Sequence, residues 1–205
     1  MSTEYHKIQT IFKRDQQTNR IIEGSYSLQE FELLKDVPWI WTEKVDGTNI
    51  RVIWNGETIT FGGKTDNAQI PQFLVNRLNE LFLPIEQRLK FKEIFADAKE
   101  VCLYGEGYGA KIQSGGNYRG TQDFVLFDVK IGDWWLEREN VLDIATKLGL
   151  DIVPIVLEGT ITEAISKVRE GMKSTWGDFI AEGLVGRPKV ELRTRRGDRI
   201  ITKIK

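Results

Sequence analysis

Strand-like segments follow one another in runs along this chain, and helical segments interrupt the runs at irregular intervals. A doubly wound fold needs strands and helices to alternate strictly, so the irregular order favours an α+β fold with largely antiparallel sheets. The 205 residues suffice for a full hydrophobic core. We find no linker, repeat or low-complexity tract, and we therefore expect residues 1–205 to form a single domain.

Turn and capping signals mark where the expected elements begin and end. Ser27 and Glu30 have the spacing of a capping box and predict a helix at that point. Asn55-Gly56 predicts a two-residue hairpin, and the apolar spacing from Pro71 to Phe95 predicts a helical stretch interrupted by a proline. Further helices are expected at Glu137–Leu148 and Thr162–Met172.

The expected strands begin with a hairpin near the N-terminus and end with a strand-rich C-terminal segment. They are Ile8–Phe12 and Arg20–Glu23 (the hairpin), Trp39–Lys44, Asn49–Trp54, Thr58–Phe61, Val101–Tyr104, Phe124–Val129, Ile152–Val156, Gly183–Val185, Val190–Thr194 and Arg199–Ile204. The glycine-rich segment Gly105–Gly109 lacks dinucleotide-fold spacing, and we interpret it as a mobile turn.

The composition excludes several classes of site. The 29 Lys and Arg residues oppose 30 Asp and Glu residues, so any basic surface must be local. Cys102 and His6 are the only residues of their types, which excludes an internal disulfide, a cysteine-cluster zinc site and a histidine-rich metal site. No apolar stretch has the length of a signal peptide or a membrane span. We therefore expect a cytoplasmic protein without a membrane partner, and a monomer.

The strongest local signal is the segment Glu43-Lys44-Val45-Asp46-Gly47-Thr48-Asn49, which places a lysine at the end of an apolar strand beside a tight turn. A lysine buried next to other cations loses its proton readily and becomes a nucleophile. The alternative is a solvated lysine before a hairpin, because Lys-x-Asp-Gly alone is a short and unspecific pattern.

Further motifs follow Lys44 in a fixed order: Gly105-Glu106-Gly107, Phe127 inside a strand, Glu182-Gly183-Leu184-Val185 and Lys203-Ile204-Lys205. This ordered set resembles the covalent nucleotidyltransferase superfamily of polynucleotide ligases and mRNA capping enzymes. The form Lys44-Val45-Asp46-Gly47-Thr48-Asn49 is most similar to the RNA ligase 2-like branch of ATP-dependent RNA ligases. The resemblance covers the chain from Trp39 onward and implies a nucleotidyltransferase (ATP-grasp-like) domain, with largely antiparallel sheets, flanking helices and a nucleotide pocket between them.

The resemblance implies a catalytic role for three lysines. Lys44 would attack the α-phosphate of ATP and carry AMP as a covalent adduct, which requires a neutral amine. Lys203 and Lys205 would lie on the phosphates, where their charges stabilise the transition state. Solvated lysines near the C-terminus are the alternative.

The resemblance also implies a set of nucleotide-binding residues: Glu43, Asn49, Lys64, Glu106, Phe127 and Glu182. Glu106 would accept a hydrogen bond from the ribose, Phe127 would stack on adenine, and Glu182 would help to hold Mg²⁺ or Mn²⁺. Core packing is an equally good interpretation of Phe127, and an asparagine that satisfies its own turn is one of Asn49. The branch often has arginine where this chain has Lys64, which lacks bidentate reach.

A local basic patch lies at the end of the chain, where residues 187–205 contain 8 Lys and Arg residues but only Glu191 and Asp198 as acids. Such a patch suits a phosphate-rich ligand. A solvated hairpin is the alternative. Arg193, Arg195 and Arg196 lie within the patch.

These observations predict an ATP-dependent RNA ligase active in RNA repair. It would transfer AMP from Lys44 to a 5′-phosphate RNA end and seal that end to a 3′-hydroxyl, for example in a nicked duplex. The branch usually carries a further C-terminal domain, and we expect none after Lys205. The alternatives are a DNA ligase, a GTP-using capping enzyme and a non-catalytic module that binds nucleic-acid ends. The full set of lysines and glutamates argues against a mere binding module.

Overall fold

The structure, a computed structural model, describes residues 4–205, which divide into two compact units. Unit 1 comprises residues up to His6 together with Val45–Val153, and unit 2 comprises Lys7–Lys44 and Pro154–Lys205. Lys44 therefore closes a segment of unit 2, and Val45 opens a segment of unit 1. The expectation of one nucleotidyltransferase domain over residues 1–205 stays a prediction.

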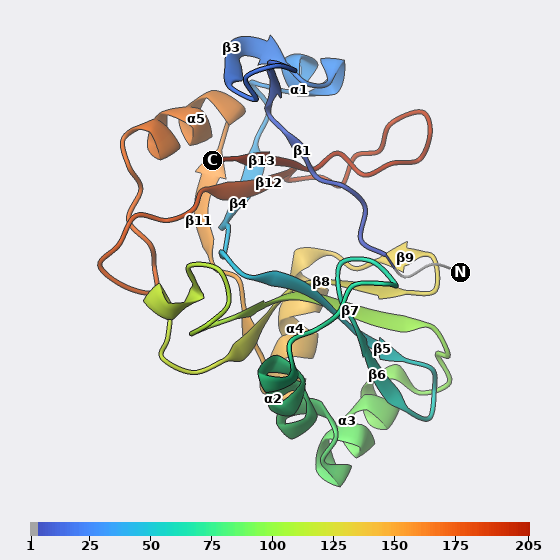
Figure 1. Ribbon diagram of the computed structural model, residues 1–205. Helices are drawn as coiled ribbons and strands as arrows, with labels where there is room; N and C mark the ends of the chain where they lie inside the picture. Colours follow the sequence, from blue (N-terminus) through green and yellow to red (C-terminus); the bar gives the residue numbers. More distant parts are fainter. Residues whose placement is uncertain (1–3) are drawn as a thin grey trace. The chain divides into compact units, whose positions relative to one another are not determined.

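Unit 1 contains a six-stranded sheet in the order β10-β8-β7-β5-β6, with β9 paired to β8. Helices α2, α3 and α4 lie together on one face of this sheet (Figure 1). The bounds are β5 Thr48–Trp54, β6 Ile59–Gly62, α2 Gln72–Phe82, α3 Ile85–Phe95, β7 Val101–Tyr108, the 3₁₀ helix η1 Gly115–Asn117, β8 Asp123–Ile131, β9 Trp134–Trp135, α4 Arg138–Leu148 and β10 Asp151–Ile152.

The core of unit 1 forms because both element types present one apolar face. Along α2, Leu74, Leu78 and Phe82 recur every fourth residue and are fully buried. They pack against alternate residues of the sheet, such as Ile50 and Leu103. Pro84 is the N-cap residue of α3, so the predicted helical stretch with a proline interruption is confirmed.

Unit 2 contains a five-stranded sheet in the order β1-β13-β12-β4-β11, and a separate hairpin of β2 and β3. Its core includes the stacked rings of Trp39 and Trp41, with α5 beside them. A capping box between Thr160 and Glu163 starts α5. The bounds are β1 Gln9–Thr10, β2 Phe12–Arg14, β3 Ile21–Tyr26, α1 Gln29–Leu33, β4 Trp39–Glu43, β11 Ile155–Gly159, α5 Ile161–Arg169, β12 Leu184–Pro188 and β13 Thr202–Ile204.

The predicted α+β class with largely antiparallel sheets is confirmed. Among the described strands, only β1 with β13 and β10 with β8 pair in parallel. The predicted N-terminal hairpin is present as β2 and β3, although Gln9–Thr10 separates from it and pairs with β13.

Two local predictions about turns are wrong. Ser27 does not cap α1, because its hydroxyl donates to the carbonyl of Thr10 and Leu28 takes the N-cap position. The turn between β5 and β6 is longer than two residues, since Trp54 pairs with Ile59. The Asn55 side chain stabilises this longer turn by accepting the backbone N–H groups of residues 57 and 58.

Two predicted strands also differ from the structure. The single strand expected at Ile152–Val156 is divided, because β10 pairs with β8 in unit 1 whereas β11 pairs with β4 in unit 2. Val190–Thr194 forms no strand, and only an isolated bridge joins Arg193 to Arg199 there. Alternation of side chains is a weak strand signal where no neighbouring ladder is available.

The glycine-rich segment expected to be a mobile turn belongs to β7, which continues to Tyr108. Its glycines serve close packing. A Cβ atom at Gly105 would lie 2.2 Å from the Phe124 ring, and one at Gly107 would lie 2.5 Å from Leu74. Small residues are therefore required where this sheet meets its core, and flexibility is not the reason for them.

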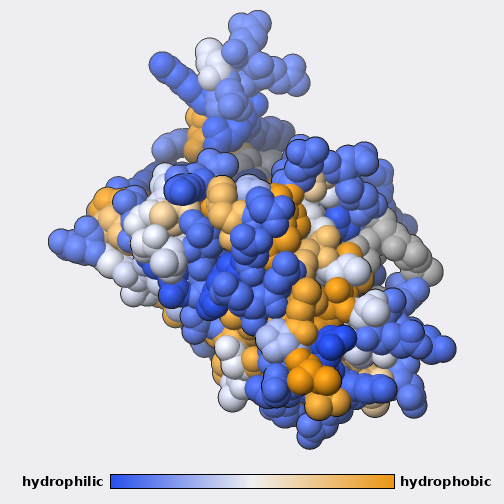
Figure 2. Space-filling model, turned by 60° about the horizontal axis from the view of Figure 1, so that its bottom comes forward, coloured by the Kyte–Doolittle hydropathy of each residue, from blue (hydrophilic) through white to orange (hydrophobic). Residues whose placement is uncertain are grey.

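The surface on the side of α2 and α3 mixes apolar and hydrophilic residues, and Figure 2 shows apolar atoms gathered between hydrophilic ones on the face turned forward. Leu83, Ile85 and Leu89 are exposed apolar residues of these helices and their connection. Within residues 4–205, no helix is long and apolar enough to cross a membrane.

We predict that Gly105→Ala lowers the free energy of unfolding by about 1–3 kcal/mol, because the added methyl group collides with the Phe124 ring. Urea denaturation measures this difference. Gly120→Ala is the control, since a Cβ atom at Gly120 meets no other atom within 4 Å. Equal stability of the two variants would contradict the packing role of Gly105.

Candidate functional site

Strand register in unit 2 brings Lys44, Glu182 and Lys205 to the same end of three neighbouring strands. Leu184 of β12 lies opposite both Glu43 of β4 and Ile204 of β13. The Lys44 N–H group donates to the Gly183 carbonyl at 2.9 Å and continues this ladder by one residue. Residues that adjoin a row of paired strand residues must lie close to one another. The charged side chains of Lys44, Glu182 and Lys205 therefore converge.

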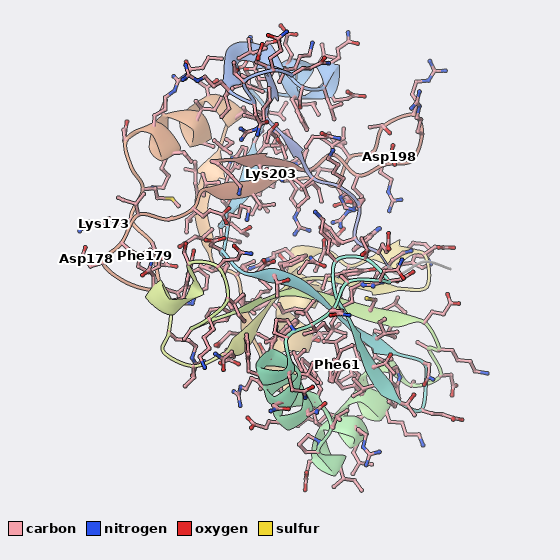
Figure 3. The ribbon with its side chains drawn as sticks, viewed as in Figure 1. Phe61, Lys173, Asp178, Phe179, Asp198 and Lys203 are labelled. Carbon is pink, nitrogen blue, oxygen red and sulfur yellow. The ribbon has the colours of Figure 1, made fainter. Side chains whose placement is uncertain are left out.

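Glu182 is the centre of this charged cluster, which we define as Lys44, Glu182 and Lys205. Lys44 Nζ donates to Glu182 Oε2 at 2.5 Å, and Lys205 Nζ donates to Glu182 Oε1. The side chains of Lys44 and Glu182 are only 21% and 17% exposed. Lys203 lies on β13 (Figure 3) in register with Val185. More ammonium groups than carboxylates gather here, which is the charge balance that phosphate groups require.

Glycine is the only residue type that fits at position 183, directly after Glu182. Its φ is +149°, and a Cβ atom would lie 2.0 Å from the Ile204 carbonyl oxygen. A side chain would therefore push β12 away from β13 and separate Glu182 from Lys205. The Glu-Gly pair of the motif thus has a structural cause.

Glu43 is buried, and its carboxylate is engaged by a loop that precedes β12. It accepts hydrogen bonds from the Ser174 hydroxyl at 2.5 Å and from the N–H and hydroxyl of Thr175, each at 2.8 Å. Lys173 and Asp178 pair across the same loop at 2.5 Å (Figure 3). The side chain of Glu43 thus fixes the peptide before Lys44, and a nucleotide contact by Glu43 stays a prediction.

In unit 1, Asp46 and Gly47 anchor the chain just after Lys44. The Asp46 carboxylate accepts the Ser114 N–H at 3.2 Å, and its own N–H donates to the Tyr118 hydroxyl at 3.2 Å. A Cβ atom at Gly47 would lie 2.3 Å from the carbonyl oxygen of Gly107. These contacts explain the Asp-Gly pair as packing against β7 and the following loop.

Three predicted nucleotide-binding residues share one face of the six-stranded sheet. Asn49 lies directly opposite Glu106, and Glu106 lies opposite Val125, two residues before Phe127. This face is the one away from the core with α2, because the alternate residues Ile50, Leu103 and Leu126 point into that core. Asn49, Glu106 and Phe127 define what we call the binding face of unit 1.

A β-bulge lies at Phe127. Tyr104 pairs with Asp128 and Gly105 with Leu126, so Phe127 is the extra residue on β8. It is half-buried and lies outside the hydrophobic core of unit 1, contrary to the core-packing interpretation. Its ring contacts that of Tyr5 edge to face, with centroids 5.3 Å apart.

Asn49 supplies an acceptor atom suited to a ligand. Its Oδ1 atom is buried and has no hydrogen-bond partner among residues 4–205. The interpretation that this asparagine satisfies its own turn is therefore wrong for the side-chain oxygen. A buried acceptor without a partner is costly, and a ligand hydroxyl or a water molecule would remove that cost.

One thiol and two phenols near the binding face stay neutral near physiological pH. Burial raises the pKa of the Cys102 thiol to about 11, and burial also raises the pKa of the Tyr104 and Tyr108 phenols. Cys102 is thus an inert buried thiol. Lys64 is exposed in the segment after β6.

No group of three or more His, Cys, Asp or Glu side chains among residues 4–205 could hold a metal ion. Mg²⁺ is nevertheless compatible with Glu182, because this ion keeps much of its water shell and commonly uses one or two carboxylates together with substrate phosphates. The partly buried carboxylate of Glu182 fits that requirement.

The structure adds residues that sequence reasoning missed. Arg51 is buried beside the binding face, and Tyr5 packs on Phe127 although it precedes every recognised motif. Neither has a local sequence signal, because their partners lie far away along the chain. Asp46 carried a signal as part of Lys-x-Asp-Gly, but its contact to the loop at Ser114 did not.

The chain is similar to a known protein family and to several solved structures. The family model for RNA ligase matches residues 37–205. A variant of Naegleria gruberi RNA ligase with ATP and Mn is 17% identical with a TM-score of 0.64, over 85% of this chain and 50% of that chain. A second variant with ATP and Mn is 19% identical with a TM-score of 0.64, over 96% and 55%.

An apo variant of the same ligase is 20% identical, with a TM-score of 0.62, over 85% of this chain and 51% of that chain. At these identities the likeness concerns the fold, which is that of the RNA ligase nucleotidyltransferases. The chain spans about half the length of the matched Naegleria gruberi chains. A search of curated protein sequences gives no match.

We predict that Glu43→Gln lowers the free energy of unfolding by about 1–3 kcal/mol, because a buried carboxylate with three donors loses charge-assisted hydrogen bonds. Urea denaturation measures the change. Glu158→Gln is the control, since Glu158 forms an exposed ion pair with Lys189 that contributes little. A similar small change in both variants would contradict the role of the Glu43 carboxylate in fixing the peptide before Lys44.

Proposed function

Because the chain belongs to the RNA ligase family, we propose that it is an ATP-dependent RNA ligase that works through AMP bound covalently to Lys44. The observation that carries the proposal is the charged cluster, in which Glu182 hydrogen-bonds both Lys44 and Lys205 within one compact unit. A lysine beside a carboxylate and a second lysine is suited to bind a nucleoside triphosphate.

The first step is nucleophilic attack by Lys44 on ATP. The ammonium group must leave Glu182 and lose a proton to solvent water, since only the neutral amine carries the electron pair that attacks. A bond then forms between Nζ and the α-phosphorus, the bond to the bridging oxygen breaks, and pyrophosphate departs with that electron pair. Lys203 and Lys205 stabilise the negative charge that develops on the phosphates.

The binding face of unit 1 supplies the proposed contacts to the nucleoside. Glu106 accepts a hydrogen bond from a ribose hydroxyl, and Phe127 stacks on adenine with its ring, which lies on the face away from the core. The buried Oδ1 atom of Asn49 accepts a further ligand hydroxyl. Lys64 contacts a phosphate from its exposed position after β6.

Glu182 is the proposed ligand of a divalent cation. Naegleria gruberi RNA ligase variants were determined with ATP and Mn, and Mg²⁺ or Mn²⁺ suits the same carboxylate here. Such an ion neutralises phosphate charge when bound.

The later steps transfer AMP to a 5′-phosphate RNA end and join that end to a 3′-hydroxyl, with release of AMP. The basic patch supports an RNA substrate, and the structure separates a buried arginine of this patch from three exposed ones. Arg199 is buried, and its Nε–H group donates a hydrogen bond to Glu191 Oε1 at 2.5 Å, so this arginine stabilises the fold. Arg193, Arg195 and Arg196 are exposed near Asp198 (Figure 3) and are available to RNA phosphates.

We predict that Lys44→Ala abolishes covalent labelling by α-labelled ATP and Mg²⁺, because no other group of the cluster is expected to form the bond. Labelling is measured on denatured protein, and circular dichroism verifies folding. Lys90→Ala, which removes an exposed lysine of α3, is the control and should label normally.

Equal labelling of Lys44→Ala and the parent would refute the assignment of the nucleophile. Labelling by GTP alone would move the protein to the capping enzymes. If protein free of pre-bound AMP accepts label from neither nucleotide, the chain is a binding module without catalysis.

We predict that the combined substitutions Arg193→Glu, Arg195→Glu and Arg196→Glu weaken binding of a nicked RNA duplex and flatten its dependence on salt. Each lost phosphate contact reduces the slope of log K against log salt by about 0.9 for a duplex. Titrations at several KCl concentrations measure the slope, and covalent labelling by ATP should survive.

The matched control is Arg88→Glu, Lys90→Glu and Lys92→Glu, which changes the net charge equally on exposed positions of α3. A loss of RNA binding shared by both triple variants would indicate a nonspecific charge effect. An unchanged slope in the first triple variant would place the RNA grip elsewhere.

A further inference from the structure

Arg51 is a fully buried charge on the same sheet face as Asn49 and Glu106. It lies on β5 opposite Gly62 of β6 and Tyr104 of β7, two residues after Asn49. Its side chain is only 1% exposed. Burying an arginine is costly unless its donors are bonded, and an apolar residue in its place would usually stabilise the fold as well or better. The partners of Arg51 therefore indicate its purpose.

The guanidinium group fastens the segment that follows β6. Its Nε–H donates to the Gly63 carbonyl at 2.7 Å, and Nη1–H donates to Asp66 Oδ1 at 2.7 Å. Lys64 lies between these two anchor points. We call residues 63–66 the Lys64 loop. The loop is thus held on both sides of a lysine whose own side chain is exposed.

Gly62 provides the space that this arrangement needs. A Cβ atom at Gly62 would lie 2.8 Å from Nη2 of Arg51 and 3.0 Å from its Cζ. The guanidinium group therefore lies over the backbone of β6, and a side chain at position 62 would require the guanidinium group to shift from its anchor points. A lysine at position 51 has no planar fork and could not bond both anchor points in this geometry.

We propose that Arg51 is a positioning residue, which holds the Lys64 loop so that the Lys64 ammonium group meets a phosphate of the bound nucleotide or of the RNA 5′ end. Arg51 itself is too deeply buried to touch substrate. The inference rests on the proposed function, in which Lys64 is a phosphate ligand. It adds a residue whose effect on ligation passes through Lys64.

A double-mutant cycle tests this inference. Single-turnover sealing of a nicked RNA with a pre-adenylylated 5′ end is measured for the parent, Arg51→Lys, Lys64→Ala and the double variant. We expect Arg51→Lys to slow sealing about tenfold in the parent and to cause no further loss in Lys64→Ala. The same loss in both backgrounds would overturn the inference, because a merely structural effect lowers every rate alike.

A second variant keeps the test decisive if Arg51→Lys fails to fold. Asp66→Asn weakens one anchor, because the hydrogen bond from Arg51 loses its charged acceptor, and the side chain is 65% exposed, so the fold should tolerate it. We expect slower sealing again, and again no further loss in the Lys64→Ala background. Sealing at the parent rate by Asp66→Asn, together with an unfolded or unaffected Arg51→Lys, would overturn the inference.

The matched control is Arg77→Lys, because Arg77 is an ion-paired arginine of the same unit that contacts Asp123 at 3.2 Å rather than the Lys64 loop. It should seal at the parent rate, and a loss equal to that of Arg51→Lys would count against positioning. Covalent labelling of the parent by ATP separates the two hypotheses. Absence of label refutes the proposed function, whereas normal label with Lys64→Ala sealing at the parent rate refutes only the role of Arg51.

Discussion

The pairing of β12 with β4 and β13 is the constraint on which the charged cluster depends. A slip of one residue turns every side chain of a strand to the other face, so the cluster exists only in one register. That register is fixed by apolar packing, because Leu184 and Ile204 point into the same core as Trp41. Hydrophobic burial thus determines where Glu182 and Lys205 meet, although neither belongs to the core.

The peptide that carries Lys44 is anchored on both sides of this proposed nucleophile. Before it, the carboxylate of Glu43 accepts three hydrogen bonds from Ser174 and Thr175. After it, Asp46 accepts the Ser114 N–H, and Gly47 packs against the backbone of Gly107. The backbone is fixed where the proposed mechanism requires the side chain to move, since Lys44 would exchange its contact with Glu182 for a phosphate. Anchoring of this kind reduces the entropy lost when the reacting atoms are aligned.

The sequence predicted elements best where periodicity was long and unbroken. The helical stretch from Pro71 to Phe95 and the strand before Lys44 were recognisable, because their apolar residues match a single template. The sequence predicted elements poorly where a contact with a residue far along the chain decides the local structure. Ser27 bonds Thr10 instead of its own helix, and Gly105 is a strand residue because Phe124 needs its space.

The same reason explains what could be foreseen of the site. Motif order identified the lysines and glutamates, because each motif is local and their sequence along the chain is specific. The contacts that support them join remote segments, as Glu43 and Ser174 are 131 residues apart. Phe127 shows the limit most clearly. Alternation alone allows a core or a surface position, and one extra residue in β8 turns both Phe127 and Asp128 to the binding face while Leu126 and Val129 remain in the core. A bulge changes the phase of a strand without changing its composition. Alternation from Leu126 turns Phe127 away from the core, whereas alternation from Val129 would turn it inward, and the pairing with β7 decides which of the two applies.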